Sequence, residues 1–127
     1  MSRTQAQITV LMPLPVFYNP DSRGQREPVE NEKFLATAEQ ISSRFGGGVL
    51  HRFTNGTPTG FWWSRGVLSQ DEIGAFEVDM QDTDENRSWI KTYARDVLLH
   101  RFCQDAIYVK FIGPIESLEV TEETITE

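Results

Sequence analysis

The stretch from Asp82 to Gly113 constrains this chain most, because a helical pattern is followed there at once by a strand pattern. Six apolar residues fall within half of a helical wheel, as expected for a helix that packs on a core. They are Trp89, Ile90, Tyr93, Ala94, Val97 and Leu98. Asp82 and Glu85 have the spacing of a capping box, which predicts a helix from about Asp82 to residue 103 or 104.

The segment from Ala106 to Ile112 alternates between two faces, with Ile107, Val109 and Phe111 on one of them. This period of two predicts a strand directly after the helix. Gly113 and Pro114 follow and predict the end of that strand.

The remaining pattern predicts an α+β fold of the ferredoxin-like split βαβ type, with an antiparallel sheet and two helices on one face. We expect a strand from residue 8, paired as far as Met12, and a helix over residues 30–45 that ends at three glycines. A strand at 49–54 and a strand at 74–80 should enclose a loop-rich insertion, which begins with the turn signal Asn55-Gly56.

The chain of 127 residues is expected to form one domain over 1–127, with flexible ends at 1–7 and about 119–127. No apolar run approaches the roughly 20 residues that span a membrane. A single cysteine, Cys103, excludes an intramolecular disulfide framework and favours a cytoplasmic location.

The face of the sheet that carries no helix is expected to lie open. Its predicted residues mix apolar and charged side chains, which suits a homo-oligomer interface or a protein partner better than bulk solvent. They are Leu11, Leu50, Arg52, Ala75, Glu77, Asp79, Tyr108, Lys110 and Ile112.

Trp62 and Trp63, with Arg52 and Arg65 nearby, form the most informative aromatic cluster. Tryptophan and arginine are enriched in binding hot spots, and adjacent residues of a strand point to opposite sides. One ring would then face inward and the other a ligand or partner. Alternatively, the segment folds back over the open sheet and both rings serve in packing.

Between Arg65 and Arg87 the chain has seven acidic residues and no basic one, within a net charge of −7. This balance disfavours direct binding to nucleic acid, which depends on lysine and arginine. The segment is either a set of solvated loops or an acidic surface for a basic partner. The residues are Asp71, Glu72, Glu77, Asp79, Asp82, Asp84 and Glu85.

No catalytic group, metal site or cofactor motif is expected. His51 and His100 are the only histidines and lack a metal-ligand spacing, and one cysteine cannot supply the usual zinc sets. No nucleophile elbow or dinucleotide fingerprint occurs.

Two short motifs resemble those of a group of small bacterial proteins that have no assigned activity. The first is Arg44-Phe-Gly-Gly47 followed by Gly60-x-Trp62, and the second is Phe102-x-Gln-Asp105 followed by Ala106-Ile-Tyr-Val109. The resemblance implies a compact α+β domain and carries over no functional residue.

Three hypotheses follow. The first is a non-enzymatic interaction module that assembles through the open sheet face, with Tyr108 in that surface and Trp62 or Trp63 as an anchor. The second is a small enzyme or ligand-binding domain with a pocket between sheet and helices, lined by His51, Arg52, Trp62 and Tyr108. The third is an acidic decoy that occupies a nucleic-acid-binding protein.

Overall fold

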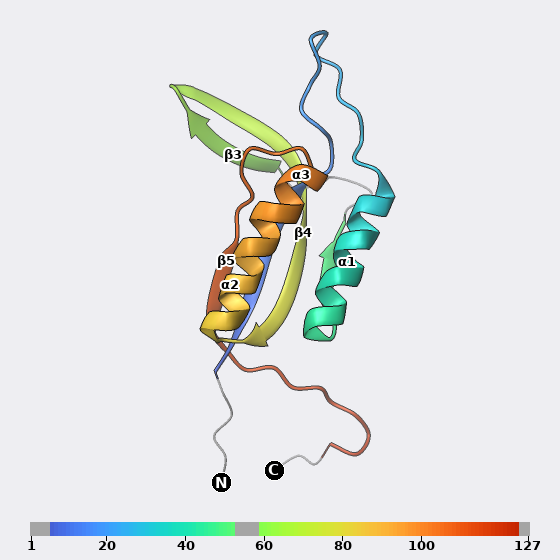
Figure 1. Cartoon of the computed structure of the whole chain (residues 1–127), viewed down its shortest axis with the longest axis vertical. Coiled ribbons are helices and arrows are strands. Elements are labelled where there is room, and N and C mark those ends of the chain that lie inside the picture. The colour runs from blue at the N-terminus through green and yellow to red at the C-terminus, as the bar shows by residue number, and fades with distance from the viewer. Residues whose placement is uncertain (1–5, 53–58, 125–127) are drawn as a thin grey trace.

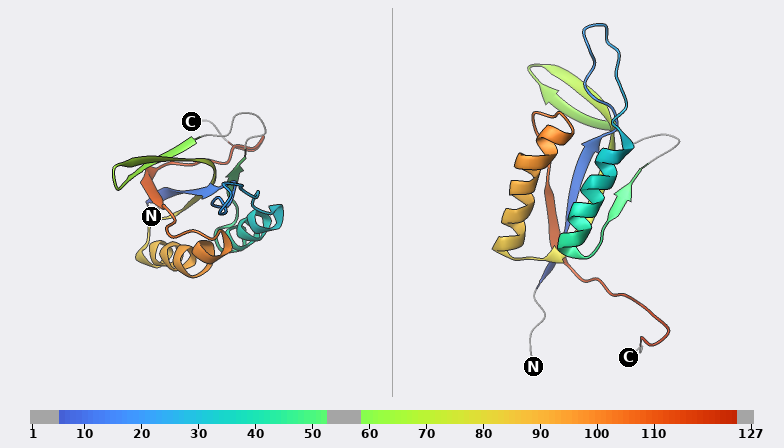
Figure 2. Two further views of the ribbon diagram at one scale, coloured as in Figure 1. Left: turned by 90° about the horizontal axis from the view of Figure 1, so that it is seen from above. Right: turned by 45° about the vertical axis from the view of Figure 1, so that its right-hand side comes forward.

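A computed structural model describes residues 6–52 and 59–124, without the side chains of Trp62 and Ser64. It consists of an antiparallel sheet of five strands and a layer of helices on one face of that sheet (Figure 1; Figure 2, left). The predicted α+β class is therefore confirmed. The expected turn at Asn55-Gly56 and most of the expected flexible N-terminus lie outside the described residues.

The strands are numbered in chain order. They are β1 (Gln7–Pro15), β2 (Val49–His51), β3 (Thr59–Ser64), β4 (Val67–Gln81) and β5 (Lys110–Ile115). The helices are α1 (Asn31–Phe45), α2 (Asp84–Tyr93), the π-helical turn η1 (Ala94–Leu98) and α3 (Leu99–Arg101). No helix in the described part of the chain is both long and apolar enough to cross a membrane.

The sheet has the strand order β2-β4-β1-β5, and β3 pairs with β4 outside this path. Every pair is antiparallel. β1 pairs with β4 as far as Pro15, so the expected end of pairing near Met12 is wrong. The N–H of Val16 donates to Glu72 of β4. Because backbone groups alternate along a strand, the nitrogens of Pro13 and Pro15, which carry no hydrogen, point to the other side of β1. On that side β1 pairs with β5 only as far as Leu11, so the two prolines do not interrupt any hydrogen bond of the sheet.

The two faces of the short strand β2 are reversed relative to the prediction, which placed Leu50 on the open face. Leu50 lies opposite Phe76 and shares its core face, whereas Val49 and His51 lie on the open face with Glu77. Glycine at position 48 permits this close pairing, because a Cβ there would lie 2.9 Å from the backbone oxygen of Glu77. Three residues are too few for alternation alone to show which face is inward.

The predicted loop-rich insertion is in large part a β-hairpin. β3 runs into β4 through Arg65 and Gly66, whose φ angles of 52° and 76° are those of a type I′ turn. β4 is consequently a single strand of 15 residues. Its first part pairs with β3 and its second part with β1 and β2.

The first helix agrees with the prediction, and Gly46 ends it with a φ of 90°. In the second helix the N-cap is Thr83 rather than Asp82, since the Thr83 side chain accepts a hydrogen bond of 3.0 Å from the Asn86 N–H. Asp82 instead accepts 2.6 Å and 3.2 Å hydrogen bonds from Arg87. The predicted apolar stripe is confirmed, with Ile90 and Leu98 buried in the core.

The last strand begins later and ends later than expected. β5 starts at Lys110, so Tyr108 belongs to the loop before it, and the strand continues through Gly113 and Pro114 to Ile115. β5 is an edge strand, where proline is tolerated. Pairing with β1 is irregular between Gln7 and Thr9, next to this Gly-Pro step.

The core lies between the helices and the inward face of β1 and β4. Phe34 of α1 meets Phe102, just after α3, edge to face at 5.2 Å between ring centroids. This contact joins the two helical segments over the sheet. The other buried apolar side chains from the strands are Ile8, Val10, Met12, Leu14, Phe76, Val78 and Met80.

Replacing Phe34 with alanine should lower the free energy of unfolding by about 3–5 kcal/mol, because a buried aromatic ring leaves a cavity. Leu35 is the matched control, since it is the next residue of α1 and is 56% exposed. Leu35→Ala should stay within about 0.5 kcal/mol in urea unfolding. Equal losses for both variants would contradict this location of the core.

The Arg87 guanidinium holds the pKa of Asp82 below its ordinary value of 3.8, chiefly through their hydrogen bonds. Asp82 therefore contributes stability above pH 3.8, and this contribution is lost as the pH falls through the lowered pKa of the folded state. Arg87→Gln should raise the Asp82 pKa in an NMR titration. Arg95→Gln should leave it unchanged, because Arg95 binds Asp96.

Candidate functional site

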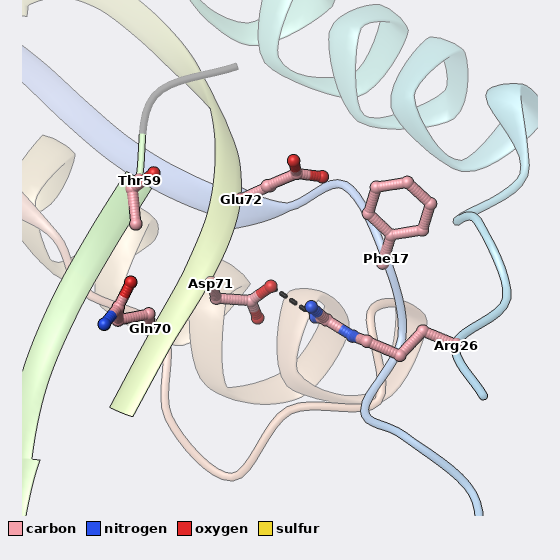
Figure 3. Close-up of a pocket in the computed structure, with 6 residues that line it drawn as sticks. All are labelled: Phe17, Arg26, Thr59, Gln70, Asp71 and Glu72. Atoms are coloured by element: carbon pink, nitrogen blue, oxygen red, sulfur yellow. Dashed lines mark hydrogen bonds and ion pairs between the residues drawn. The ribbon is translucent and has the colours of Figure 1, made fainter. Parts of the chain in front are cut away.

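An open groove lies at the base of the β3–β4 hairpin, where the loop after β1 approaches β4 (Figure 3). Arg26 reaches from that loop to Asp71 of β4 and forms an ion pair with it. Asp71 is only 8% exposed, which makes it the buried carboxylate among the described residues. The groove has a volume of about 460 Å³, and its other lining residues are Phe17, Thr59, Gln70 and Glu72.

Arg26 is held in place by three contacts. Besides Asp71, its Nε donates a 3.1 Å hydrogen bond to the backbone oxygen of Tyr18, and its guanidinium lies 5.7 Å from the centre of the Phe17 ring. A carboxylate that is already paired with arginine is a poor general base. The pair therefore fastens the loop to β4 rather than supplying acid–base chemistry.

A second polar cluster joins the same loop to the start of α1. The Tyr18 hydroxyl donates to Glu30 and accepts from Lys33, whose Nζ also lies 4.8 Å from the centre of the Tyr18 ring. Burial, followed by the Glu30 hydrogen bond, raises the pKa of Tyr18. The hydrogen bond with Tyr18 lowers the pKa of Glu30 and raises that of Lys33. The tyrosine is thus kept neutral between two charged groups.

The β3–β4 hairpin projects beyond the helical layer, and we call residues 59–72 the hairpin arm (Figure 1). Phe61 and Trp63 are 63% and 71% exposed, and Val67 and Leu68 are exposed as well. Trp63 lies opposite Leu68 in the ladder and therefore shares a face with it and with Phe61. The arm thus carries a row of exposed apolar side chains.

The exposure of Trp63 bears on the two interpretations of the tryptophan pair. Trp63 does not fold back to pack on the sheet, since most of its side chain is exposed. Trp62 pairs through its backbone with Ser69. Arg65 lies at the tip of the arm and is exposed.

The other predicted binding residues do not come together. His51 lies on the open face at the β2 end of the sheet, with its Nε2 3.3 Å from the Glu77 carboxylate. Arg52 turns toward the start of α1, where it binds Asn31 and lies over the Phe34 ring. Tyr108 is exposed before β5, at the opposite end of the strand order. His51 and Tyr108 therefore do not line a common pocket.

Most of the predicted acidic residues have a partner within the chain. Asp71 binds Arg26 and Asp82 binds Arg87, while Glu85 lies 3.5 Å from Arg44. On the open face Glu77 meets His51, and Asp79 accepts a 2.6 Å hydrogen bond from Thr9. Glu72 and Asp84 are exposed. The seven acids are therefore distributed over the hairpin, the sheet face and the start of α2.

Sequence reasoning missed Arg26, Tyr18 and Lys33, which lie in or next to the polar segment between β1 and α1. The signals were the length of this segment and the aromatic pair Phe17-Tyr18 at its start. Within the described residues no group of three or more histidine, cysteine or acidic side chains is placed to hold a metal ion.

Comparisons with known proteins give no identification. A scan against protein-family models found no match, and a search of curated proteins found none either.

Replacing Arg26 with methionine should lower the free energy of unfolding by about 1–3 kcal/mol, because Asp71 is left as an unpaired, buried charge. Adding Asp71→Asn to that variant should recover part of the loss, which a double-mutant cycle in urea measures. Glu72→Gln is the control, since Glu72 lines the same groove but is exposed. Additive effects of the two substitutions would show that the pair is not coupled.

Proposed function

We propose that this protein is a non-enzymatic interaction module that binds a protein partner through the hairpin arm. The single observation that carries the proposal is the exposure of Phe61 and Trp63 on one face of a projecting hairpin. Aromatic side chains bury about 150–250 Å² each when they are packed. Leaving two of them in water is costly unless a partner covers them.

The composition of the arm resembles that of a binding hot spot. Tryptophan and arginine are the residues that most often dominate the affinity of protein interfaces, and the arm presents Trp63 and Arg65 two positions apart. Leu68 lies opposite Trp63 and extends the apolar surface on the second strand. The partner that fits is a protein with an apolar pocket for the Trp63 ring.

The open sheet face is a weaker candidate for the main contact. Two of its acidic side chains already have partners, since Asp79 binds Thr9 and Glu77 meets His51. Leu50 packs on the core and Arg52 lies against α1, so two of the residues expected on this face are occupied elsewhere. The interaction surface is therefore assigned to the arm rather than to this face.

We also infer that the domain is a ferredoxin-like split βαβ sandwich to which β3 has been added. In sequence, α1 lies between β1 and β2, and in the sheet these two strands are separated by β4. Likewise, α2 lies between β4 and β5, and these two strands are separated by β1. A βαβ unit whose two strands are separated by one antiparallel strand is a split βαβ unit, and here two such units interleave. In this view the hairpin arm is an extension of the third strand of the fold. A cytoplasmic location belongs to the same proposal, since the single cysteine is a free, exposed thiol.

The proposal is tested by photo-crosslinking in the cells that make the protein. A photoreactive phenylalanine analogue at position 63 should give one dominant adduct with another protein. The same analogue at position 35, which is exposed on α1, serves as the control and should not give that adduct.

Once the adduct is identified, Trp63→Ser should weaken binding of the purified partner by about 30-fold or more, as expected for a hot-spot residue. The free energy of unfolding should change by less than about 0.5 kcal/mol, because the side chain is exposed. Equal crosslinking from positions 63 and 35, or binding that survives Trp63→Ser unchanged, would contradict the assignment of the arm.

A further inference from the structure

A second unoccupied surface lies at the other end of the sheet. An apolar groove of about 420 Å³ runs between the second helical segment and the chain that leads into β5. Ala94 and Leu99 line its helical side, and Ile107, Val109 and Phe111 line its strand side. Lys91 and Arg95, one turn apart on the helix, complete the lining. Within the described residues no ion pair of Lys91 is found, and Arg95 shares its charge with Asp96.

The groove lies beside a free strand edge. β5 is the last strand of the order β2-β4-β1-β5 and pairs only with β1 among the described strands. An extended peptide can add to such an edge through backbone hydrogen bonds and place alternate side chains in an adjacent groove. The edge of β5 and the groove together form a site for an extended segment that has two apolar residues at alternate positions.

The C-terminal tail, residues 116–124, is a segment of that kind. Leu118 and Val120 are 73% and 72% exposed and are separated by one residue. No basic residue follows Lys110, whereas five acidic residues do, which complements the two cations of the groove. Glu116 and Leu118 would share a face with Val120 in an extended conformation. The tail leaves the lower end of β5 and runs away from the body of the domain (Figure 1; Figure 2, right).

We propose that the tail of a second copy of this chain pairs with the free edge of β5 and inserts Leu118 and Val120 into the groove. Glu116 of the inserted tail meets the cations of the groove lining. This contact goes beyond the proposed function, because it uses neither the hairpin arm nor the partner that the arm binds.

The direction in which the tail leaves favours a second copy over the tail of the same chain. The Ser117 hydroxyl donates a 2.8 Å hydrogen bond to the Gln7 side chain at the start of β1. β1 lies on the paired side of β5, so this contact directs the tail away from the free edge. To enter the groove of its own chain, the tail would have to break this bond and reverse within two residues.

The proposed contact can form a symmetric dimer. β5 and the tail form one continuous segment, so two copies can pair antiparallel about a two-fold axis between Gly113 and Pro114. In this register Leu118 lies opposite Val109 of the second copy and Val120 opposite Ile107, which places both side chains on the helix side, where the groove is. A register shifted by one residue would turn both side chains to the open face. Each copy gives a tail and receives one, which limits the assembly to a dimer.

The experiment is sedimentation equilibrium of the purified full chain, of the tail variant Leu118→Ser/Val120→Ser and of the groove variant Lys91→Glu/Arg95→Glu. The wild type should be a dimer at micromolar concentration. Each variant should raise the dissociation constant of the dimer at least about 100-fold, since apolar burial or charge complementarity is lost in both halves of a symmetric contact. All substituted side chains are exposed, so circular dichroism should show an unchanged fold.

Mixing the two variants gives the decisive result. The groove variant keeps an intact tail and the tail variant keeps an intact groove, so the mixture should form a heterodimer with one complete contact. Val67→Ser on the hairpin arm is the control and should leave the wild-type dimer unchanged. A monomeric wild type, a dimer that persists in the tail variant, or a mixture without heterodimer would each overturn the proposal. A dimer that is lost only in Val67→Ser would overturn it too, and would assign self-association to the arm.

Discussion

The backbone pairing of β4 is the constraint on which the rest of the structure depends. This strand of 15 residues pairs with β1, β2 and β3, so every other strand except β5 is positioned by it directly. Its second part has neighbours on both sides around residues 75–77 and carries the buried side chains of Phe76 and Val78. Its first part leaves the core and has β3 as its strand partner. One strand thus joins a packed domain to a projecting hairpin, and the change from core to arm occurs within it.

The Arg26–Asp71 pair lies where β4 passes from the core of the domain into the hairpin arm. β1 ends opposite Ile73, and the next position toward the hairpin is fastened by the hydrogen bond from the Val16 N–H to the Glu72 oxygen. Asp71 follows directly, buried against Arg26. A two-stranded hairpin is only marginally stable by itself in water, so its base must be anchored. The loop after β1 supplies that anchor.

The sequence predicted those parts of the fold whose pattern is long enough to be unambiguous. The stripe from Trp89 to Leu98 repeats over several turns, so this helix and its buried side could be predicted. The range of α1 could be predicted too, because glycines mark its end. β2 has three residues, and the face that each presents follows from the register to β4, which is not a local property. Asp82 and Thr83 both suit an N-cap, and the choice between them depends on Arg87, which occupies the Asp82 carboxylate. For the candidate site, the sequence singled out the pair Trp62-Trp63 but not which ring is exposed. Arg26 was missed because its partner is 45 residues away.

The two proposed contacts lie at the edge strand β5 and at the hairpin arm, where the sheet is not covered by other parts of the described chain. A strand edge without a neighbour presents free backbone groups, and natural proteins usually protect such an edge with charge, proline or a covering segment. Pro114 and Lys110 protect β5 only in part, since the apolar groove beside them remains open. The arm has no acidic residue between Phe61 and Gln70, so its apolar face is not shielded by negative charge. The net charge of −7 keeps copies of the chain apart over most of their surface. Both proposed contacts therefore use places where apolar side chains and cations lie together, which are the tip of the arm and the groove beside β5.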